Sequence, residues 1–210
     1  MKALTILILL IVAQTFAQWQ PDLRLTNNPS VSLTSHNNAR CIASSGDSLH
    51  VIWHDNRDGN YEIYYKRSTD GGLSWGADIR LTNNSFYSGY SSVSVSAQVV
   101  HVVWLDERDG NTEIYYKRSI NGGSTWEADT RLTNNSLLSE YPSVSVSGQD
   151  VHVVWVDSRE GNTEIFYKRS IDGGSSWGVD TRLTNNSSLS EDPCVSVSGQ
   201  VIHVVFYDNR

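Results

Sequence analysis

The chain has 210 residues and is moderately acidic, with 16 Lys and Arg against 23 Asp and Glu and a formal net charge of −7. It contains no basic cluster, which argues against nucleic acid or an anionic membrane surface as a partner. With only two cysteines, Cys41 and Cys194, it is not a disulfide framework. Stability must come from buried apolar surface, to which the seven Trp and ten Tyr can contribute most.

Residues 1–17 have the pattern of a secretory signal peptide. Lys2 gives a positive start, residues 3–12 form one apolar run, and residues 14–17 offer a small-residue cleavage site. The apolar run is too short for a membrane-spanning helix, and no later segment is long and apolar enough to be one. We therefore expect an exported mature chain, residues 18–210, that is secreted or held in the periplasm or at the cell surface.

The mature chain is built from an internal repeat of 51 residues. Two series of aromatic residues keep this step: Trp75, Trp126 and Trp177, and Trp53, Trp104, Trp155 and Phe206. The first unit carries five extra residues, around residues 35–40. A period near 50 with strand-like content predicts a propeller or a related array.

Each unit contains four expected strands, which in the second unit follow one another along the chain. Residues 92–97 alternate Ser and Val, residues 99–105 are apolar on both faces, residues 112–119 are β-branched and aromatic, and residues 130–133 form a short outer strand. No stretch has a helical period, so the sequence predicts an all-β propeller with four-stranded antiparallel blades. The repeats provide three full blades and two strands of a fourth, with residues 23–26 as an unpaired outer strand. We expect an incomplete ring and a segment of a longer protein.

A short motif between the third and fourth strands has the form Ser-x-Asp-x-Gly-x-x-Trp. It occurs at residues 68–75, 119–126 and 170–177, with Asn for Asp in the second copy. It resembles the Asp-box, or BNR repeat, of sialidase-like propellers, and the resemblance spans residues 22–210. We expect structural roles for its residues: Asp70, Gly72, Trp75, Asn121, Gly123, Trp126, Asp172, Gly174 and Trp177.

The motif makes sense as a turn. The Asp or Asn side chain can accept hydrogen bonds from backbone amides two residues on, and the glycines permit positive φ. The Trp is expected to fold back over its own hairpin, where full burial would contribute at most roughly 5 kcal/mol. An Asp-box has too few converging carboxylates for Ca²⁺, and the sequence predicts no metal site and no cofactor. The histidines that recur in the second strand (His50, His101, His152 and His203) are expected to pack rather than bind metal.

A second repeated motif follows each second strand, on the face opposite the Asp-boxes. It places an Asp two residues before an Arg in three units: Asp55 and Arg57, Asp106 and Arg108, and Asp157 and Arg159. One interpretation is a set of ion pairs between neighbouring blades, each worth 0 to about 1 kcal/mol when exposed. The other is a ring of guanidinium groups that binds an anionic ligand.

The resemblance also raises the possibility of an enzyme. Sialidases bind the substrate carboxylate with three Arg and use a Tyr–Glu nucleophile pair and an Asp acid/base. Arg40 matches the first Arg, without the Pro that follows in the family motif, and it breaks the internal repeat. Arg57 and Asp58 fall near a further family Arg and the acid/base Asp. No Tyr–Glu pair can be placed, so the sequence does not support catalysis in this segment.

We therefore expect an exported propeller module that binds or displays at glycans or cell-surface polymers. The first alternative is an exo-α-sialidase, or another glycoside hydrolase, with its remaining catalytic residues beyond residue 210. The second alternative is a purely structural surface array.

Overall fold

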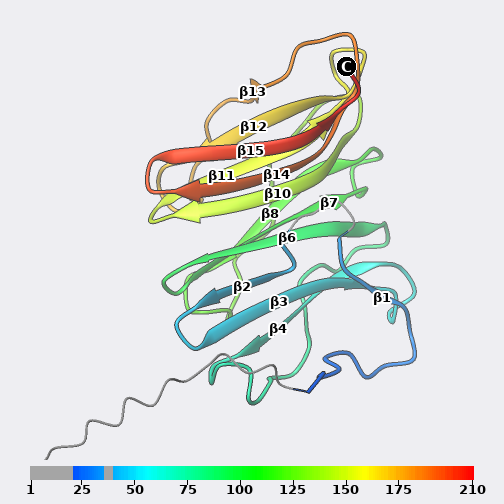
Figure 1. Cartoon of the computed structure of the whole chain (residues 1–210). Coiled ribbons are helices and arrows are strands. Elements are labelled where there is room, and N and C mark those ends of the chain that lie inside the picture. Colours follow the sequence, from blue (N-terminus) through cyan, green and yellow to red (C-terminus); the bar gives the residue numbers. More distant parts are fainter. Residues whose placement is uncertain (1–20, 36–39) are drawn as a thin grey trace, which may run out of the picture.

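The computed structural model describes residues 21–35 and 40–210, which form fifteen strands and no helix (Figure 1). The signal-peptide prediction lies outside the described residues, as does part of the expected insertion around residues 35–40. No helix in the described ranges could cross a membrane.

The strands form two complete four-stranded blades, a first blade of five strands and a two-stranded sheet. The first blade contains β1 (Ser32–Leu33), β2 (Ile42–Ser45), β3 (Ser48–Asp55), β4 (Glu62–Ser68) and β5 (Ile79–Arg80). The second contains β6 (Ser88–Ser96), β7 (Val99–Asp106), β8 (Glu113–Ser119) and β9 (Thr130–Arg131). The third contains β10 (Ser139–Ser147), β11 (Asp150–Asp157), β12 (Glu164–Ser170) and β13 (Thr181–Arg182). The last sheet is β14 (Ser190–Ser198) and β15 (Val201–Asp208).

Pairing is antiparallel in every blade. It follows chain order in the second and third blades, as the repeat predicts, whereas in the first blade β1 and β2 both pair with β3. The inner strands β2, β6, β10 and β14 pack side by side in succession (Figure 1). The sheets do not close into a ring. The predicted all-β propeller with four-stranded blades and an incomplete ring is therefore confirmed.

Apolar residues on both faces of each second strand build the cores between blades. In β7, Val102 and Trp104 face the first blade and pack with Ile52, while Val103 faces the third blade. All four are fully buried. Burying a side chain of this size contributes about 1.5–3 kcal/mol, so the interfaces between blades provide most of the stability.

The inner strands β6, β10 and β14 begin earlier than the sequence pattern indicates, because a β-bulge interrupts each of them. In β6 the register shifts between Gly89 and Ser92, and Tyr90 in the bulge has a φ of 50°. Tyr141 and Asp192 occupy the same place in β10 and β14, with φ of 54° and 51°. Non-glycine residues seldom adopt this left-handed conformation, which costs roughly 1–2 kcal/mol and is concentrated at functional sites.

Residues 23–26 do not form the expected outer strand, but they lie where one would be. Lys66 Nζ donates to Leu25 O (2.7 Å), just as Lys117 Nζ donates to Leu81 O (2.5 Å) at the end of the first blade. Leu25 thus occupies the position, relative to the first blade, that Leu81 occupies relative to the second.

Candidate functional site

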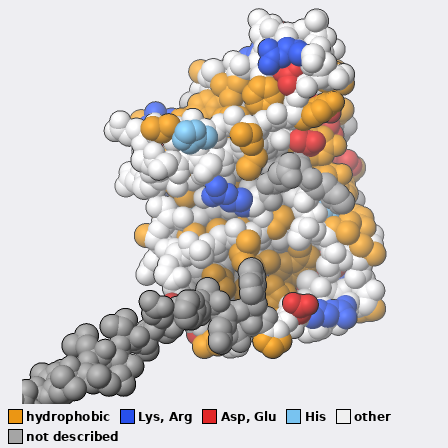
Figure 2. Space-filling model, viewed as in Figure 1, with side chains coloured by type: hydrophobic (Ala, Val, Ile, Leu, Met, Phe, Trp, Pro, Cys, Tyr) orange, Lys and Arg blue, Asp and Glu red, His pale blue; other side chains and the backbone are white. Residues whose placement is uncertain are grey.

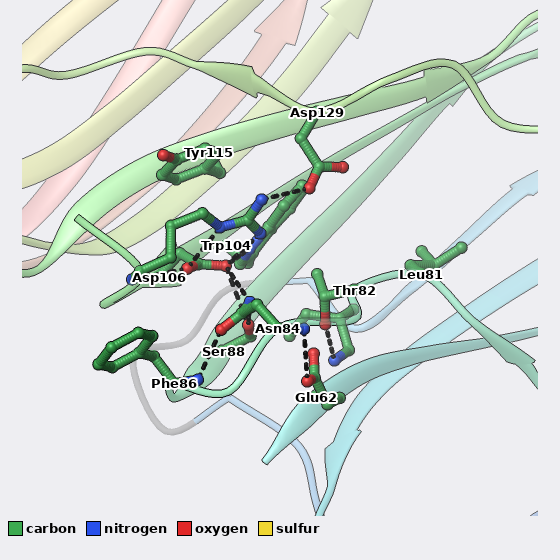
Figure 3. Close-up of polar contacts among 12 residues, drawn as sticks. Glu62, Leu81, Thr82, Asn84, Phe86, Ser88, Trp104, Asp106, Tyr115 and Asp129 are labelled. Atoms are coloured by element: carbon green, nitrogen blue, oxygen red, sulfur yellow. Dashed lines mark hydrogen bonds and ion pairs between the residues drawn. The ribbon is translucent and has the colours of Figure 1, made fainter. Parts of the chain in front are cut away.

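The repeated Asp and Arg residues lie at the end of each second strand and form closed networks. In the second blade the fully buried carboxylate of Asp106 accepts hydrogen bonds from Trp104 Nε1 (2.8 Å) and from Ser88 Oγ (2.9 Å) (Figure 3). Arg108 binds the same carboxylate through Nε (2.8 Å) and Nη2 (2.6 Å). Its Nη1 donates to Asp129 at 2.7 Å.

This network keeps Asp106 ionised although it is buried. Burial by itself would raise its pKa, but the hydrogen bonds from Arg108 and Trp104 outweigh that effect and lower it. The Arg108 guanidinium also stacks 4.4 Å from the centroid of the Tyr115 ring. The N–H donors of Arg108 and the flat face of its guanidinium are therefore occupied by contacts within the protein.

The first and third blades repeat the arrangement. Arg57 pairs with Asp55 and Asp78, and Arg159 pairs with Asp157 and Asp180. The ion pairs lie within single blades, rather than joining exposed groups of neighbouring blades as the sequence suggested. Each Arg binds one fully buried carboxylate and one that is partly exposed. In this geometry the three Arg residues stabilise the loops that follow the second strands, and each guanidinium is paired with carboxylates.

The residues that would act in a sialidase are not joined by any hydrogen bond or ion pair of the described chain. Arg40 is exposed and its Nη2 donates to Ser196 Oγ (3.0 Å), from the first blade to β14. Asp58 accepts a hydrogen bond from Tyr64 and pairs with Arg80 (3.1 Å). Arg57 is held by its two carboxylates.

The segments that resemble Asp-boxes form turns closed by their own side chains. Asp70 Oδ1 accepts from Ser74 N (2.9 Å), four residues on rather than two, and Ser68 Oγ accepts from Gly72 N (2.9 Å). Hydrogen bonds from the Ser74 hydroxyl, the Ser74 amide and the Ser68 hydroxyl lower the pKa of Asp70 to about 2. Asn121 makes the equivalent backbone contact with Thr125 N (2.9 Å).

The Trp of the second and third turns packs on the preceding blade, whereas it was expected to fold back over its own hairpin. Trp126 meets Tyr65 edge to face, with ring centroids 4.9 Å apart, and Trp177 meets Tyr116 in the same way. The turn therefore fastens one blade to the next. Sequence periodicity alone cannot show this, because the partner Tyr is about 60 residues away.

An aromatic cluster lies at the bulges, on the face opposite these turns. Tyr90 meets Tyr141 edge to face at 5.0 Å, and Tyr87 lies 5.6 Å from Tyr61 and 6.3 Å from Tyr90. His54 contacts three of these tyrosines at 5.4–6.1 Å. The tyrosines are partly exposed and the histidine is buried. We call these five residues the aromatic cluster: His54, Tyr61, Tyr87, Tyr90 and Tyr141.

The cluster occurs where the repeat breaks. One period later, His54, Tyr61 and Tyr87 are replaced by Leu105, Thr112 and Leu138. The interface between the first and second blades therefore differs from the interface between the second and third blades at three positions, and the side chains at these positions contact one another. This departure from the repeat was the signal in the sequence that could have located the site.

Gly89 is part of the same departure. A Cβ at this position would clash with the Tyr87 hydroxyl and ring. The two later copies have Glu140 and Glu191 here, each preceded by Leu at the position of Tyr87. Gly89 therefore makes the room in which the Tyr87 ring lies.

Four carboxylates lie near the cluster: Glu107, Glu140, Glu191 and Asp192. The Glu107 amide donates to Tyr87 O (3.0 Å), and Glu140 immediately precedes Tyr141. Burial and the charges of Glu107 and Glu191 raise the pKa of Glu140. Together with the tyrosine hydroxyls, these groups supply hydrogen-bonding partners around an apolar surface. No group of three or more potential metal ligands occurs in the described chain.

Comparisons with known proteins show the fold. The chain is similar to the Hadza microbial sialidase Hz136, with a TM-score of 0.63 and 16% identity over 81% of this chain and 42% of the sialidase. It is similar to a Trypanosoma rangeli sialidase, with a TM-score of 0.59 and 14% identity over 86% of this chain and 37% of that one. The phage phi92 endosialidase aligns with a TM-score of 0.57 and 10% identity over 86% and 45% of the two chains. No family model and no curated protein matches.

The chain thus spans less than half the length of these three enzymes. At such identities the likeness defines the class of fold, a sialidase-like β-propeller.

Proposed function

We propose that this chain is an exported module that binds glycans at the aromatic cluster and does not itself catalyse their cleavage. The observation that carries the proposal is the joint departure of His54, Tyr61 and Tyr87 from the repeat, next to Tyr90 and Tyr141 in strained bulges. Tyrosine offers an apolar ring and a polar tip, and ligand sites combine apolar walls with a few convergent polar groups. A sugar has the matching chemistry, with C–H faces and hydroxyl edges.

The carboxylates beside the cluster indicate the charge of the ligand. Glu107, Glu140 and Glu191 can accept hydrogen bonds from sugar hydroxyls, but like charges in a partly buried site repel an anionic sugar. We therefore propose a glycan whose bound residue is uncharged. The sialidase-like neighbours support a glycan ligand only through their fold.

Titration calorimetry against a panel of neutral and sialylated oligosaccharides tests the proposal. Tyr90→Ala and Tyr141→Ala should each weaken binding of the best neutral ligand at least tenfold, because both remove aromatic contact area. Tyr207→Ala, which removes an exposed tyrosine of β15, should leave binding unchanged. Absence of binding to every glycan would contradict the proposal and favour a purely structural array.

Gly89 provides a sharper variant. Gly89→Glu restores the residue of the later repeats and should displace Tyr87, abolishing binding and destabilising the fold by roughly 1–3 kcal/mol. Adding Tyr87→Leu restores the later pairing and should recover stability but not binding. Recovery of both would show that the Tyr87 ring is not part of the site.

One observation favours the alternative of an exo-α-sialidase: Arg40 breaks the repeat and is exposed, and among the described residues its guanidinium donates to Ser196. Turnover of a fluorogenic sialoside distinguishes the two functions. We expect none from this chain, since no nucleophile pair has been placed. Turnover above buffer that Asp58→Ala abolishes would establish the enzyme instead.

A further inference from the structure

The second of the three repeated turns, residues 119–126, contains the only Asn-Gly pair of the sequence, Asn121 followed by Gly122. The first and third turns have Asp70 and Asp172 in the place of Asn121. An Asn side chain before Gly is prone to deamidation, because glycine has no Cβ that would hinder the attack of its amide nitrogen on the side-chain carbonyl carbon. Asn121 is exposed, so water reaches it. The pair is therefore a candidate for spontaneous chemical modification.

The folded turn binds both reacting groups to other partners. Gly122 N donates to Gln98 O in the hairpin between β6 and β7 (2.7 Å). Asn121 Oδ1 accepts from Thr125 N (2.9 Å) and from Ser119 Oγ (2.9 Å), and Asn121 Nδ2 donates to Thr125 Oγ1 (2.8 Å). Gly122 N can attack Asn121 Cγ only after these hydrogen bonds open. The native conformation of the turn therefore slows the reaction.

The main chain of this turn is fitted closely against the first blade. Arg67 Nη1 donates to Gly122 O (2.7 Å). A Cβ on Gly123 would clash with the Tyr65 hydroxyl, and Trp126 packs against the same tyrosine ring. A modification that lengthens the main chain here would separate the turn from the first blade, whereas a modification confined to the side chain would leave these contacts in place.

Deamidation has two products, which differ in this respect. Gly122 N forms a bond to Asn121 Cγ, the Cγ–Nδ2 bond breaks, and the proton of Gly122 N leaves with the side-chain nitrogen as ammonia. Water then opens the cyclic imide at one of its two carbonyl carbons. Attack at Cγ gives Asp with the original main chain, whereas attack at the main-chain carbonyl carbon gives isoaspartate, which adds a methylene group to the main chain. Only the Asp product preserves the contacts with the first blade.

The other copies of the turn show how an Asp side chain is held at this position. In the third turn Asp172 Oδ1 accepts from Ser176 N (2.8 Å), and Asp172 Oδ2 accepts from the Ser176 hydroxyl (2.5 Å). Thr125 provides an amide and a hydroxyl at the corresponding place in the second turn. Its hydroxyl, which now accepts from the amide of Asn121, can rotate to donate to a carboxylate.

We infer that Asn121 is a site of spontaneous deamidation that the folded turn protects, and that the turn accepts the Asp product but not isoaspartate. Water is the only co-reactant. Conversion of Asn121 then reports on the opening of the contact between the first and second blades. The inference does not depend on the proposed glycan site, which lies at the opposite ends of the strands, where Figure 2 shows hydrophobic side chains at the right of the view.

The test incubates the full chain at mildly alkaline pH, folded and in concentrated urea, and follows residue 121 by peptide mass spectrometry. Conversion should be roughly tenfold or more slower in the folded chain, because the hydrogen bonds of the turn must open first. Ser119→Ala removes the hydroxyl that bonds to Asn121 and to Gly123 N (2.8 Å) and should accelerate conversion in the folded chain several-fold. Ser170→Ala makes the matching change in the third turn and should leave the rate at Asn121 unchanged.

The product side of the inference is tested by thermal unfolding. Asn121→Asp should keep the melting temperature of the unmodified chain, and aged chains that contain isoaspartate should melt at a lower temperature. Absence of conversion in urea, or equal rates in the folded and urea-treated chain, would overturn the inference. Equal acceleration by Ser119→Ala and Ser170→Ala would also overturn it, since opening of the whole chain rather than of the second turn would then control the reaction. So would a clearly lower melting temperature for Asn121→Asp.

Discussion

At the scale of single residues, the chain has two kinds of charged group: buried charges that are paired and stabilise the fold, and charges beside the aromatic cluster that a ligand could contact. Asp106 is fully buried and accepts hydrogen bonds from Trp104, Ser88 and Arg108. Removing one partner of a buried ion pair leaves an uncompensated charge, which is far more costly than breaking an exposed pair. The glutamates beside the aromatic cluster have no such partners among the described ion pairs.

We predict that Arg108→Ala lowers the free energy of unfolding by about 3 kcal/mol, because Asp106 would remain buried and lose its main partner. Trp126→Ala should cost about 2–3 kcal/mol, since the indole is only partly buried against Tyr65. Urea denaturation measures both. Arg24→Ala, at an exposed arginine, is the control and should change the value by less than about 0.5 kcal/mol. A loss below 1 kcal/mol for Arg108→Ala would show that Asp106 finds water or another partner.

At the scale of strands, a repeated His–Tyr pair joins the second strand to the third, on the side of the turns that resemble Asp-boxes. His101 in β7 is hydrogen-bonded to Tyr116 in β8 (2.8 Å), and His50 pairs with Tyr65 in the first blade (2.7 Å). The predicted packing role fits the burial of His50, His101 and His152, whereas His203 is exposed. Burial, and secondarily the charge of Arg118, lowers the pKa of His101 to about 4.

These histidines should make stability depend on pH. The pKa of His101 is lower in the folded chain than its value of 6.5 in the unfolded one, so between these values the unfolded state binds more protons. Stability is complete above about pH 6.5 and falls as the pH is lowered towards 4, with a loss of about 2 kcal/mol from His101 at pH 5. Urea denaturation at pH 7 and pH 5 measures it. His101→Gln should reduce the difference, whereas the exposed His203→Gln should preserve it.

At the scale of the whole molecule, the inner strands form an unclosed succession around which the blades are arranged. Cys41 lies before β2 and Cys194 within β14, and the two do not form a disulfide with each other in the structure. β6 and β10 lie between these two strands. A disulfide requires Cα atoms within roughly 7 Å, which strands separated by two others do not readily provide.

We therefore predict two reactive thiols per chain when the denatured, unreduced protein is titrated with a thiol reagent. The same titration on the Cys194→Ser variant should give one. A result of no thiols in a monomeric sample would mean that the first and fourth blades meet in a compact closure, contrary to the arrangement of the inner strands. Export of the mature chain remains a prediction that secretion of residues 1–210 from an expression host would test.

The sequence by itself determined the all-β class, the 51-residue blade and the strand order, because these follow from local patterns that recur in phase. The alternation of Ser and Val in residues 92–97 and the doubly apolar residues 99–105 were sufficient to place β6 and β7. The start of β6 was predicted four residues late, since a bulge at Tyr90 interrupts the period of two on which the prediction rests.

Only the tertiary structure decided which residues work together. Arg57, Arg108 and Arg159 looked available to an anion. Each is bound by the Asp of its own motif and by a second carboxylate that the sequence does not mark as its partner, such as Asp129 for Arg108. Trp126 was expected to cover its own hairpin and instead packs on Tyr65 of the preceding blade. The aromatic cluster draws its residues from three blades, and contacts between side chains so far apart in the chain depend on how the blades pack, which no local pattern encodes.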